Sequence, residues 1–418
     1  MDVLKVLEEM KGLRCRLTWF LKRFEDCIKT APSREHLRTY VGGQVSSLPR
    51  KSVEPIALAA GIAPRTLQEF LGLHHWDHEA VRRRVHEVVA KDHADPHAIA
   101  VVDETSFAKK GDKTAGVQRQ WCGATGKTDN CVMTVHVGYA AGEFHALLDS
   151  DLYLPKETWH EDRQRCREAG IPEDVVYRPK WRMALDLLDR VMSHGVRFQF
   201  LVADEAYGSI PAFRQGVAER ELTYVLEVPR SVLGWLKVPE VHVPPLRAPL
   251  GRPPSKPRLV HTAPKAKRVD QLWKRGGPSW KRFHVKNTDK GPEVWEVRVV
   301  RFIPCDDQLP QDECWLLVAR HALTGEIKYF LSNAPESTPP EVLLHVAFSR
   351  WHVERLFEDG KSHVGLDHFE VRNYLPIMRH LILSMVSLLF LAQQTHRLRE
   401  KKSPLDRAPS TDCRRSAA

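Results

Sequence analysis

The order of apolar runs between residues 98 and 228 constrains the fold more than any other feature of the chain. Three β-rich runs, AIAVVDE, CVMTVHVGYA and EFHALLD, follow one another closely, which is typical of an antiparallel meander. A segment with apolar residues at helical spacing, Trp181 to Ser193, separates them from a fourth run, RFQFLVADE. A second helix, Ile210 to Glu219, leads to a fifth run, LTYVLEV. Strands and helices in this order predict a mixed α/β sheet.

The same order is that of the ribonuclease-H-like fold, although other α/β proteins share parts of it. We therefore expect an α/β protein with a ribonuclease-H-like catalytic core, a β-rich insertion and an N-terminal helical domain. Residues 96–229 form the first part of this core, and the helices of residues 340–398 complete it. Residues 399–418 are expected to be a flexible basic tail.

Residues 1–95 are predicted to be helical and to form a DNA-binding domain. Within them, EPIALAAGIAPRTLQEFLG suits two short helices around a glycine turn. A helix-turn-helix and an ordinary helical hairpin explain this pattern equally well.

Residues 230–339 are rich in proline, lysine and tryptophan and are predicted to be a β-rich insertion. The stretch VHVPPLRAPLGRPPSKPR must be loop, because so much proline prevents regular hydrogen bonding. The later runs WEVRVVRFI, CWLLVARH and KYFLSNA indicate strands.

Charge and cysteine usage narrow the functional classes. The chain has 63 Lys and Arg against 53 Asp and Glu, a net charge of +10, which favours a polyanionic partner without establishing one. Its 8 cysteines include no CxxC pair, so a zinc ribbon is not expected. The longest apolar run, Leu381 to Ala392, is interrupted by serines and is shorter than the ~20 residues of a membrane helix. We expect a cytoplasmic protein without a membrane partner.

Two aspartates follow apolar runs in the predicted core. Asp103 closes AIAVV and is followed by polar residues, and Asp204 follows FLVA before a turn at Tyr207 and Gly208. Such residues often cap the turn or helix that follows. If the two strands are neighbours, however, their carboxylates lie side by side.

A third carboxylate lies in SRWHVERLFEDGK, where Glu354, Glu358 and Lys361 are spaced 4 and then 3 apart. This spacing places them along one side of a helix, where they could equally form a solvated Glu–Lys face. Three carboxylates from separate segments suit a pair of Mg²⁺ ions roughly 4 Å apart, which is the requirement of two-metal phosphodiester cleavage. The sequence has no GxxxxGK[ST], HExxH or GxSxG motif that would indicate a different chemistry.

Three segments together resemble the DDE transposases of bacterial insertion sequences that carry a β-rich insertion before the last acid. They are VVDETSFAKKGDKTAGVQRQWCGATGK, LVADEAYG and RWHVERLFEDGK. In the third segment Arg350, Glu354 and Lys361 fit the family's spacing, whereas Ala347 occupies the position of the family's tyrosine.

The resemblance implies a catalytic and metal-binding triad of Asp103, Asp204 and Glu354, with Mg²⁺ or Mn²⁺ as cofactor. It implies DNA contacts by Arg350 and Lys361, double-stranded transposon ends and target DNA as partners, and a homodimer in the active complex. The implied reaction cleaves transposon ends and joins the 3′-hydroxyl to target DNA. A domesticated or decayed transposase that binds without cutting, and a ribonuclease-H-like nuclease, are the alternatives.

Overall fold

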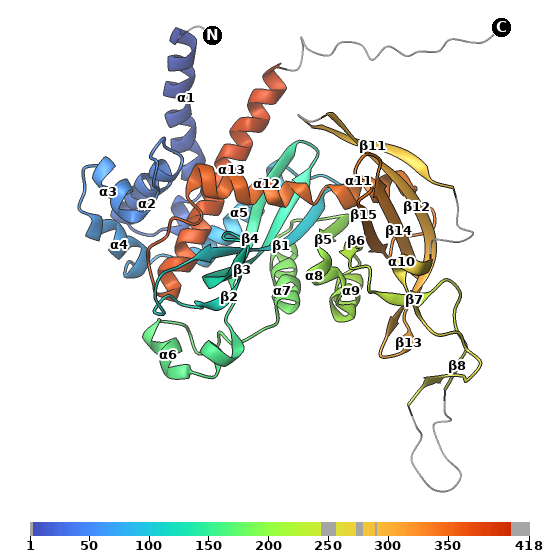
Figure 1. The fold of residues 1–418 in the computed structure, drawn as a ribbon. Coiled ribbons are helices and arrows are strands. Elements are labelled where there is room, and N and C mark those ends of the chain that lie inside the picture. Colours follow the sequence, from blue (N-terminus) through green and yellow to red (C-terminus); the bar gives the residue numbers. More distant parts are fainter. Residues whose placement is uncertain (1–2, 244–255, 273–278, 289–290, 403–418) are drawn as a thin grey trace, which may run out of the picture.

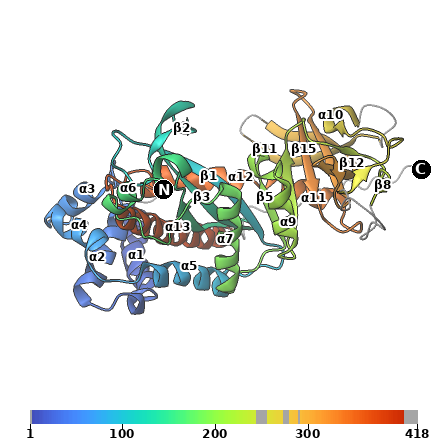
Figure 2. The ribbon, with the colours of Figure 1, turned by 90° about the horizontal axis from the view of Figure 1, so that it is seen from below.

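One mixed sheet of 13 strands runs through the molecule (Figure 1). The computed structural model describes residues 3–243, 256–272, 279–288 and 291–402. Figure 2 shows two lobes, with the N-terminal helices and the first core strands in one and the insertion strands in the other. The apolar side chains of both lobes belong to one continuous buried cluster.

The predicted core contains the expected strands in a defined spatial order. Strands β1 (Ile99–Ala108), β3 (Lys127–Ala141) and β4 (Phe144–Leu152) are antiparallel, and β5 (Phe200–Ala203) and β6 (Thr223–Val228) run parallel to β1. Their order in the sheet is β4-β3-β1-β5-β6. A strand that was not predicted, β2 (Gln118–Cys122), forms a hairpin with β3.

Strand β1 is longer than its apolar run indicated. The end of the apolar run AIAVV suggested that Asp103 lies at or near a strand end, but Asp103 lies within β1, which continues for five more residues to Ala108. Thr105 and Phe107 are β-formers, and antiparallel pairing with β3 satisfies their backbone groups.

Helices cover both faces of the core strands. Helix α7 (Lys180–Ser193) packs on β3 and β4, and α12 (Trp351–Asp359) packs on β1, β3 and β4. The remaining helices between β4 and β6 are short: η2 (Lys156–His160), α6 (Arg163–Glu168), α8 (Glu205–Gly208) and α9 (Pro211–Ala218).

The insertion extends the core sheet, because β15 pairs antiparallel with β6. The three predicted strand runs are confirmed as β12 (Gly291–Asp306), β14 (Cys314–His321) and β15 (Ile327–Ser332). Most of the proline-rich stretch lies outside the described residues. The smaller elements are β7 (Leu233–Trp235), β8 (Val241–His242), β9 (Arg258–Leu259), β10 (Lys267–Arg268), α10 (Val269–Leu272), β11 (Lys281–Thr288) and β13 (Leu309–Pro310).

The C-terminal part contains α11 (Pro340–Phe348), α12, a π-helical turn η3 (Gly360–Val364) and the long helix α13 (Tyr374–Lys402). The tail predicted from residue 399 begins later than expected, since α13 continues to Lys402; its remainder lies outside the described residues. By length and composition alone α13 could cross a membrane, but 78% of its apolar window is buried inside the protein. Such burial is typical of a core helix.

The first 92 residues form α1 (Val3–Lys22), η1 (Glu25–Cys27), α2 (Ala31–Gln44), α3 (Val53–Ala59), α4 (Pro64–Gly72) and α5 (His78–Asp92). Helices α3 and α4 flank the predicted glycine turn, where Gly61 has a φ of +69°. Helix α2 is tied to α13 by buried hydrogen bonds from Tyr40 to His380 (2.8 Å) and from Gln44 to Ser384 (2.8 Å).

A buried ionic cluster joins the N-terminal helices to the core sheet. Asp149 of β4 is fully buried and accepts hydrogen bonds from Arg190 of α7 at 2.6 and 2.9 Å. Arg82 of α5, which is also buried, lies 3.5 Å from the same carboxylate. Burial raises the pKa of Asp149, but Arg82 and Arg190 outweigh this effect and hold the pKa below its usual value.

Candidate active site

Asp103 and Asp204 occupy equivalent positions on neighbouring parallel strands. Val102 of β1 is in register with Ala203 of β5, and the two aspartates are the next residues along the chain. Adjacent strands lie about 4.8 Å apart, so the two carboxylates are close neighbours. The structure thus brings together two of the three predicted acids.

Backbone hydrogen bonds orient both carboxylates. Asp103 Oδ1 accepts from the N–H of Glu104 at 2.7 Å. Asp204 Oδ1 accepts from the N–H groups of Ala206 (3.0 Å) and Tyr207 (3.4 Å), so Asp204 also caps α8. The capping interpretation and the neighbouring-carboxylate interpretation of Asp204 are therefore both correct.

The environment of Asp103 opposes its ionisation. Burial is the main cause, and repulsion by Asp204 adds to it, which raises the pKa of Asp103 to about 7. A cation placed between the two carboxylates would relieve this repulsion.

In this structure the cation beside Asp103 is Arg350, the residue that precedes α12. Its Nη1 lies 3.3 Å from Asp103 Oδ2, and its Nη2 lies 2.5 Å from Glu354 Oε1. Glu354 is exposed, and Arg350 bridges it to Asp103. Within the described residues, no group of three or more His, Cys, Asp or Glu side chains is placed to hold a metal ion.

The donor chemistry nevertheless fits a divalent cation. Asp103 and Asp204 offer oxygen ligands, which Mg²⁺ and Mn²⁺ prefer, and each has one oxygen already fixed by the backbone. Glu354 would supply a third carboxylate once Arg350 moves away from it. The arginine side chain therefore has to change its contacts before all three acids can meet.

Two carboxylates near the site were not predicted. Leu226 is in register with Ala203, so Glu227 follows on β6 as Asp204 follows β5. Glu227 pairs with Lys328 of β15 at 3.1 Å. The run LTYVLEV contained this signal, an acid near the end of a third apolar strand.

The other is Glu104, beside Asp103. Lys180 at the start of α7 lies 2.6 Å from Glu104 Oε1, and the buried Tyr207 donates its hydroxyl to Oε2 at 3.4 Å. These two contacts join α7 and α8 to β1 at the residue next to Asp103.

Lys361 lies beyond α12, in the π-helical turn η3, and is half-buried. Its Nζ lies 5.9 Å from the centre of the Phe107 ring, and burial lowers its pKa. Glu358, the other acid in this helix, is exposed and pairs with Arg355 at 3.4 Å. The α-helix α12 ends at Asp359, and a π-helical turn begins at Gly360, before Lys361.

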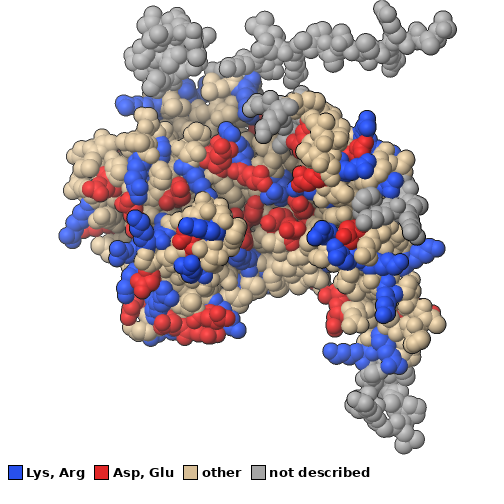
Figure 3. Space-filling view, in the orientation of Figure 1, with Lys and Arg blue, Asp and Glu red and all other residues tan. Residues whose placement is uncertain are grey.

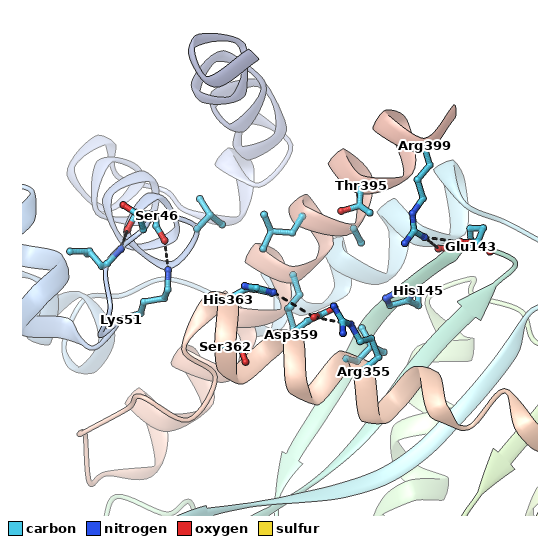
Figure 4. A pocket seen from close by; sticks show the side chains of 17 residues that line it. Ser46, Lys51, Glu143, His145, Arg355, Asp359, Ser362, His363, Thr395 and Arg399 are labelled. Carbon is cyan, nitrogen blue, oxygen red and sulfur yellow. Dashed lines mark hydrogen bonds and ion pairs between the residues drawn. The ribbon is translucent and has the colours of Figure 1, made fainter. Parts of the chain in front are cut away.

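Figure 3 shows acidic side chains gathered near the centre of one face of the molecule, with Lys and Arg side chains around them. A cavity of about 520 Å³ lies elsewhere, between the α2–α3 linker, the β3–β4 turn, α12 and α13 (Figure 4). Four of its charged groups pair with one another: Arg355 with Asp359 at 3.1 Å, and Arg399 with Glu143 at 2.8 Å. None of the three predicted acids lines this cavity.

Comparison with known proteins identifies the family. The model of the DDE superfamily endonucleases matches residues 23–292, a region that includes both aspartates but not Glu354. A probable transposase for insertion sequence element IS701 from Microchaete diplosiphon is 27% identical over 373 residues, 86% of this chain and 81% of the relative. The NurA nuclease from Sulfolobus solfataricus aligns over 76% of this chain and 88% of its own, but at 10% identity and a TM-score of 0.24, which is too low to bear on the fold. More than half of the chain matches the family model, and the chain therefore belongs to the DDE superfamily of endonucleases.

Proposed function

We propose that this chain is a DNA transposase that cleaves the ends of an insertion sequence and joins them to target DNA. The proposal includes a ribonuclease-H-like core, which the strand order β4-β3-β1-β5-β6 supports. It also includes a helical DNA-binding domain before residue 96 and double-stranded DNA as substrate. The similarity to a probable insertion-sequence transposase supports the same reaction.

The observation that carries this proposal is the side-by-side placement of Asp103 and Asp204, with Arg350 linking Asp103 to Glu354. We assign these three acids as catalytic ligands of Mg²⁺ or Mn²⁺. When bound, a metal pair activates the attacking oxygen and stabilises the leaving oxygen. In this proposal, backbone N–H groups orient the carboxylates of Asp103 and Asp204, and α12 supplies Glu354.

Conservative replacement of each acid tests the chemistry. Asp103→Asn, Asp204→Asn and Glu354→Gln should each abolish cleavage in Mg²⁺ of a labelled duplex that carries the terminal sequence of its own element. Binding of the same duplex in EDTA should change little, because Lys and Arg contacts to phosphate supply most of the affinity. Glu358→Gln is the matched control and should cleave normally. A variant that still cleaves removes its residue from the triad, and binding without cleavage by the unmodified protein would favour a decayed transposase.

We also assign Lys361 to the DNA backbone, because it lies on the α12 side of the sheet beside Phe107. Lys361→Ala should weaken DNA binding and lower the slope of log K against log salt by about one unit, the value for one lost phosphate contact. Anisotropy titrations at four salt concentrations measure this slope. An unchanged slope together with a lower melting temperature would instead assign Lys361 to packing.

A further inference from the structure

Strand β2 presents two side chains to solvent that the proposed catalytic site does not use. Arg119 and Trp121 are both exposed, and 62% of the Trp121 surface is accessible. A single exposed tryptophan is common on protein surfaces and by itself indicates nothing. The position of Trp121 relative to Asp103 is what indicates a role for it.

Strand register places both side chains on the same face of the sheet as Asp103. Asp103 lies opposite His136 of β3, and Trp121 lies opposite Thr128 of the same strand. Residues directly opposite one another in antiparallel strands point to the same face, and so do residues an even number of positions apart. Eight residues separate Thr128 from His136, so Trp121 shares the face of Asp103. Arg119, two residues earlier, shares it as well.

This face is the one that α12 covers. His136 packs against Phe357 of α12 with ring centres 5.0 Å apart, and Leu356 lies 3.1 Å from the Cβ position of Gly138. Beyond the end of α12 the hairpin of β2 and β3 continues the same face toward solvent, and Figure 2 shows β2 standing out from the body of the core.

The inner side of the hairpin is anchored, so the outer side is presented rigidly. Gln120 donates to the carbonyl of Cys131 at 3.2 Å, and the N–H of Ala124 in the turn donates to Ser106 of β1 at 3.3 Å. Asn130 donates to the carbonyls of Lys109 and Gly111 at 2.9 and 2.6 Å, which fixes the preceding loop. A rigid display lowers the entropy cost of binding.

The charge of the segment around Arg119 and Trp121 indicates which kind of partner this surface binds. Between residues 109 and 129 the chain has five Lys or Arg residues and two acids, Asp112 and Asp129, of which Asp129 lies 3.9 Å from Lys127. Among the described residues, no acidic side chain forms an ion pair with Arg119, Lys110 or Lys113. A basic surface with an exposed aromatic ring suits nucleic acid, where cations contact phosphates and the ring contacts a base or sugar.

We propose that Arg119 and Trp121 form an accessory DNA-binding surface, which contacts the same duplex that the catalytic acids cleave. Eight strand residues span at most roughly 27 Å, so the contact falls within one turn of the duplex from the cleaved phosphate. This inference rests on the proposed function, since it needs DNA on the catalytic face.

Four variants of the full chain test the inference, using a labelled 40-base-pair duplex that carries the terminal sequence of its own element, in EDTA. Trp121→Ala should weaken binding about fivefold or more, and Trp121→Phe should retain most of the affinity. Arg119→Ala should lower the salt slope by about one unit. Leu323→Ala is the control, because Leu323 is 85% exposed but lies in the turn between β14 and β15, and it should bind within about twofold of the unmodified protein.

Wild-type affinity in both Trp121→Ala and Arg119→Ala would overturn the inference, and so would an equal loss in Leu323→Ala. Melting temperatures should match the unmodified protein within about two degrees, because both side chains are exposed. Asp103→Asn on the same duplex separates the two ideas. If that variant still cleaves, the catalytic assignment fails while the binding result for Trp121 stands. If it binds without cleaving and Trp121→Ala binds normally, only the accessory surface fails.

Discussion

At the scale of single residues, Arg350 is the cation that balances the acidic site in this structure. It contacts Asp103 and Glu354, and Asp204 and Glu227 also act on it electrostatically. Without Arg350, the partly buried carboxylates would face one another without a counter-charge. The guanidinium therefore supplies the counter-charge of the site in this structure, and it would have to release these contacts for the proposed metal ion to bind.

Arg350→Ala should accordingly lower the free energy of unfolding in EDTA by about 1–2 kcal/mol. Added Mg²⁺ should raise the melting temperature of this variant more than that of the unmodified protein, because the ion no longer competes with the arginine. Thermal unfolding with and without Mg²⁺ measures both effects. Arg355→Ala is the matched control, since Arg355 lies one turn into the helix that follows Arg350 and, within the described part of the chain, pairs with Glu358 and Asp359. An equal Mg²⁺ response in both variants would contradict this role.

At the scale of elements, His380 links α13 to α2 and to the segment after η3. Its Nδ1 lies 2.8 Å from the Tyr40 hydroxyl, and its Nε2 lies 3.1 Å from the carbonyl of Gly365 and 3.2 Å from that of Leu366. A neutral ring with the proton on Nε2 satisfies all three contacts. Burial lowers the pKa of His380 to about 4.

The pH dependence of stability follows from this shift. The folded pKa lies below the ordinary value of 6.5, so the contribution of the neutral ring is complete above pH 6.5 and is lost as the pH falls toward 4. The loss amounts to about 3 kcal/mol across that window. His380→Gln should be less stable than the unmodified protein at pH 7.5 and should lose less stability between pH 6.5 and 4. Urea unfolding at several pH values measures this, and the exposed His75 provides the control His75→Gln, which should leave the pH profile unchanged.

Local sequence patterns predicted most elements of the core, because strand runs and helical spacing are local signals. The position of Asp103 inside β1 was missed because its polar neighbours pair with β3, a partner that only the folded sheet provides. Glu227 was missed for a related reason, since its place beside Asp204 depends on the register of β5 and β6. The contact of Arg350 with Asp103 joins residues 247 positions apart, and no spacing rule foresees it.

At the scale of the whole molecule, the cluster around Asp149 fastens the N-terminal helices to the sheet. Arg82 of α5 and Arg190 of α7 approach its carboxylate from two sides, and neither Asp149 nor Arg82 is exposed. Removing one partner leaves a buried charge without compensation, which is costly. The N-terminal helices and the core should therefore unfold together.

Asp149→Asn should lower the free energy of unfolding by about 3 kcal/mol. The unmodified protein should show one urea transition by both circular dichroism and tryptophan fluorescence, since both regions share one core. Glu87→Gln is the control, because it removes an ion pair on the exposed part of α5 and should cost well under about 1 kcal/mol. Two separate transitions in the unmodified protein would show that the helices fold independently of this cluster.

The pairing of β15 with β6 also keeps β6 from pairing with strands of other molecules. An edge strand with unpaired backbone groups is a template for other chains, and a short apolar one such as TYVLEV promotes aggregation. Because β15 hydrogen-bonds along β6, the insertion shields this strand from other molecules. A shortened chain that lacks residues 230–339 would keep Asp103 and Asp204 but would expose that strand. The insertion thus protects the edge of the core sheet, and we expect a chain shortened by its removal to aggregate.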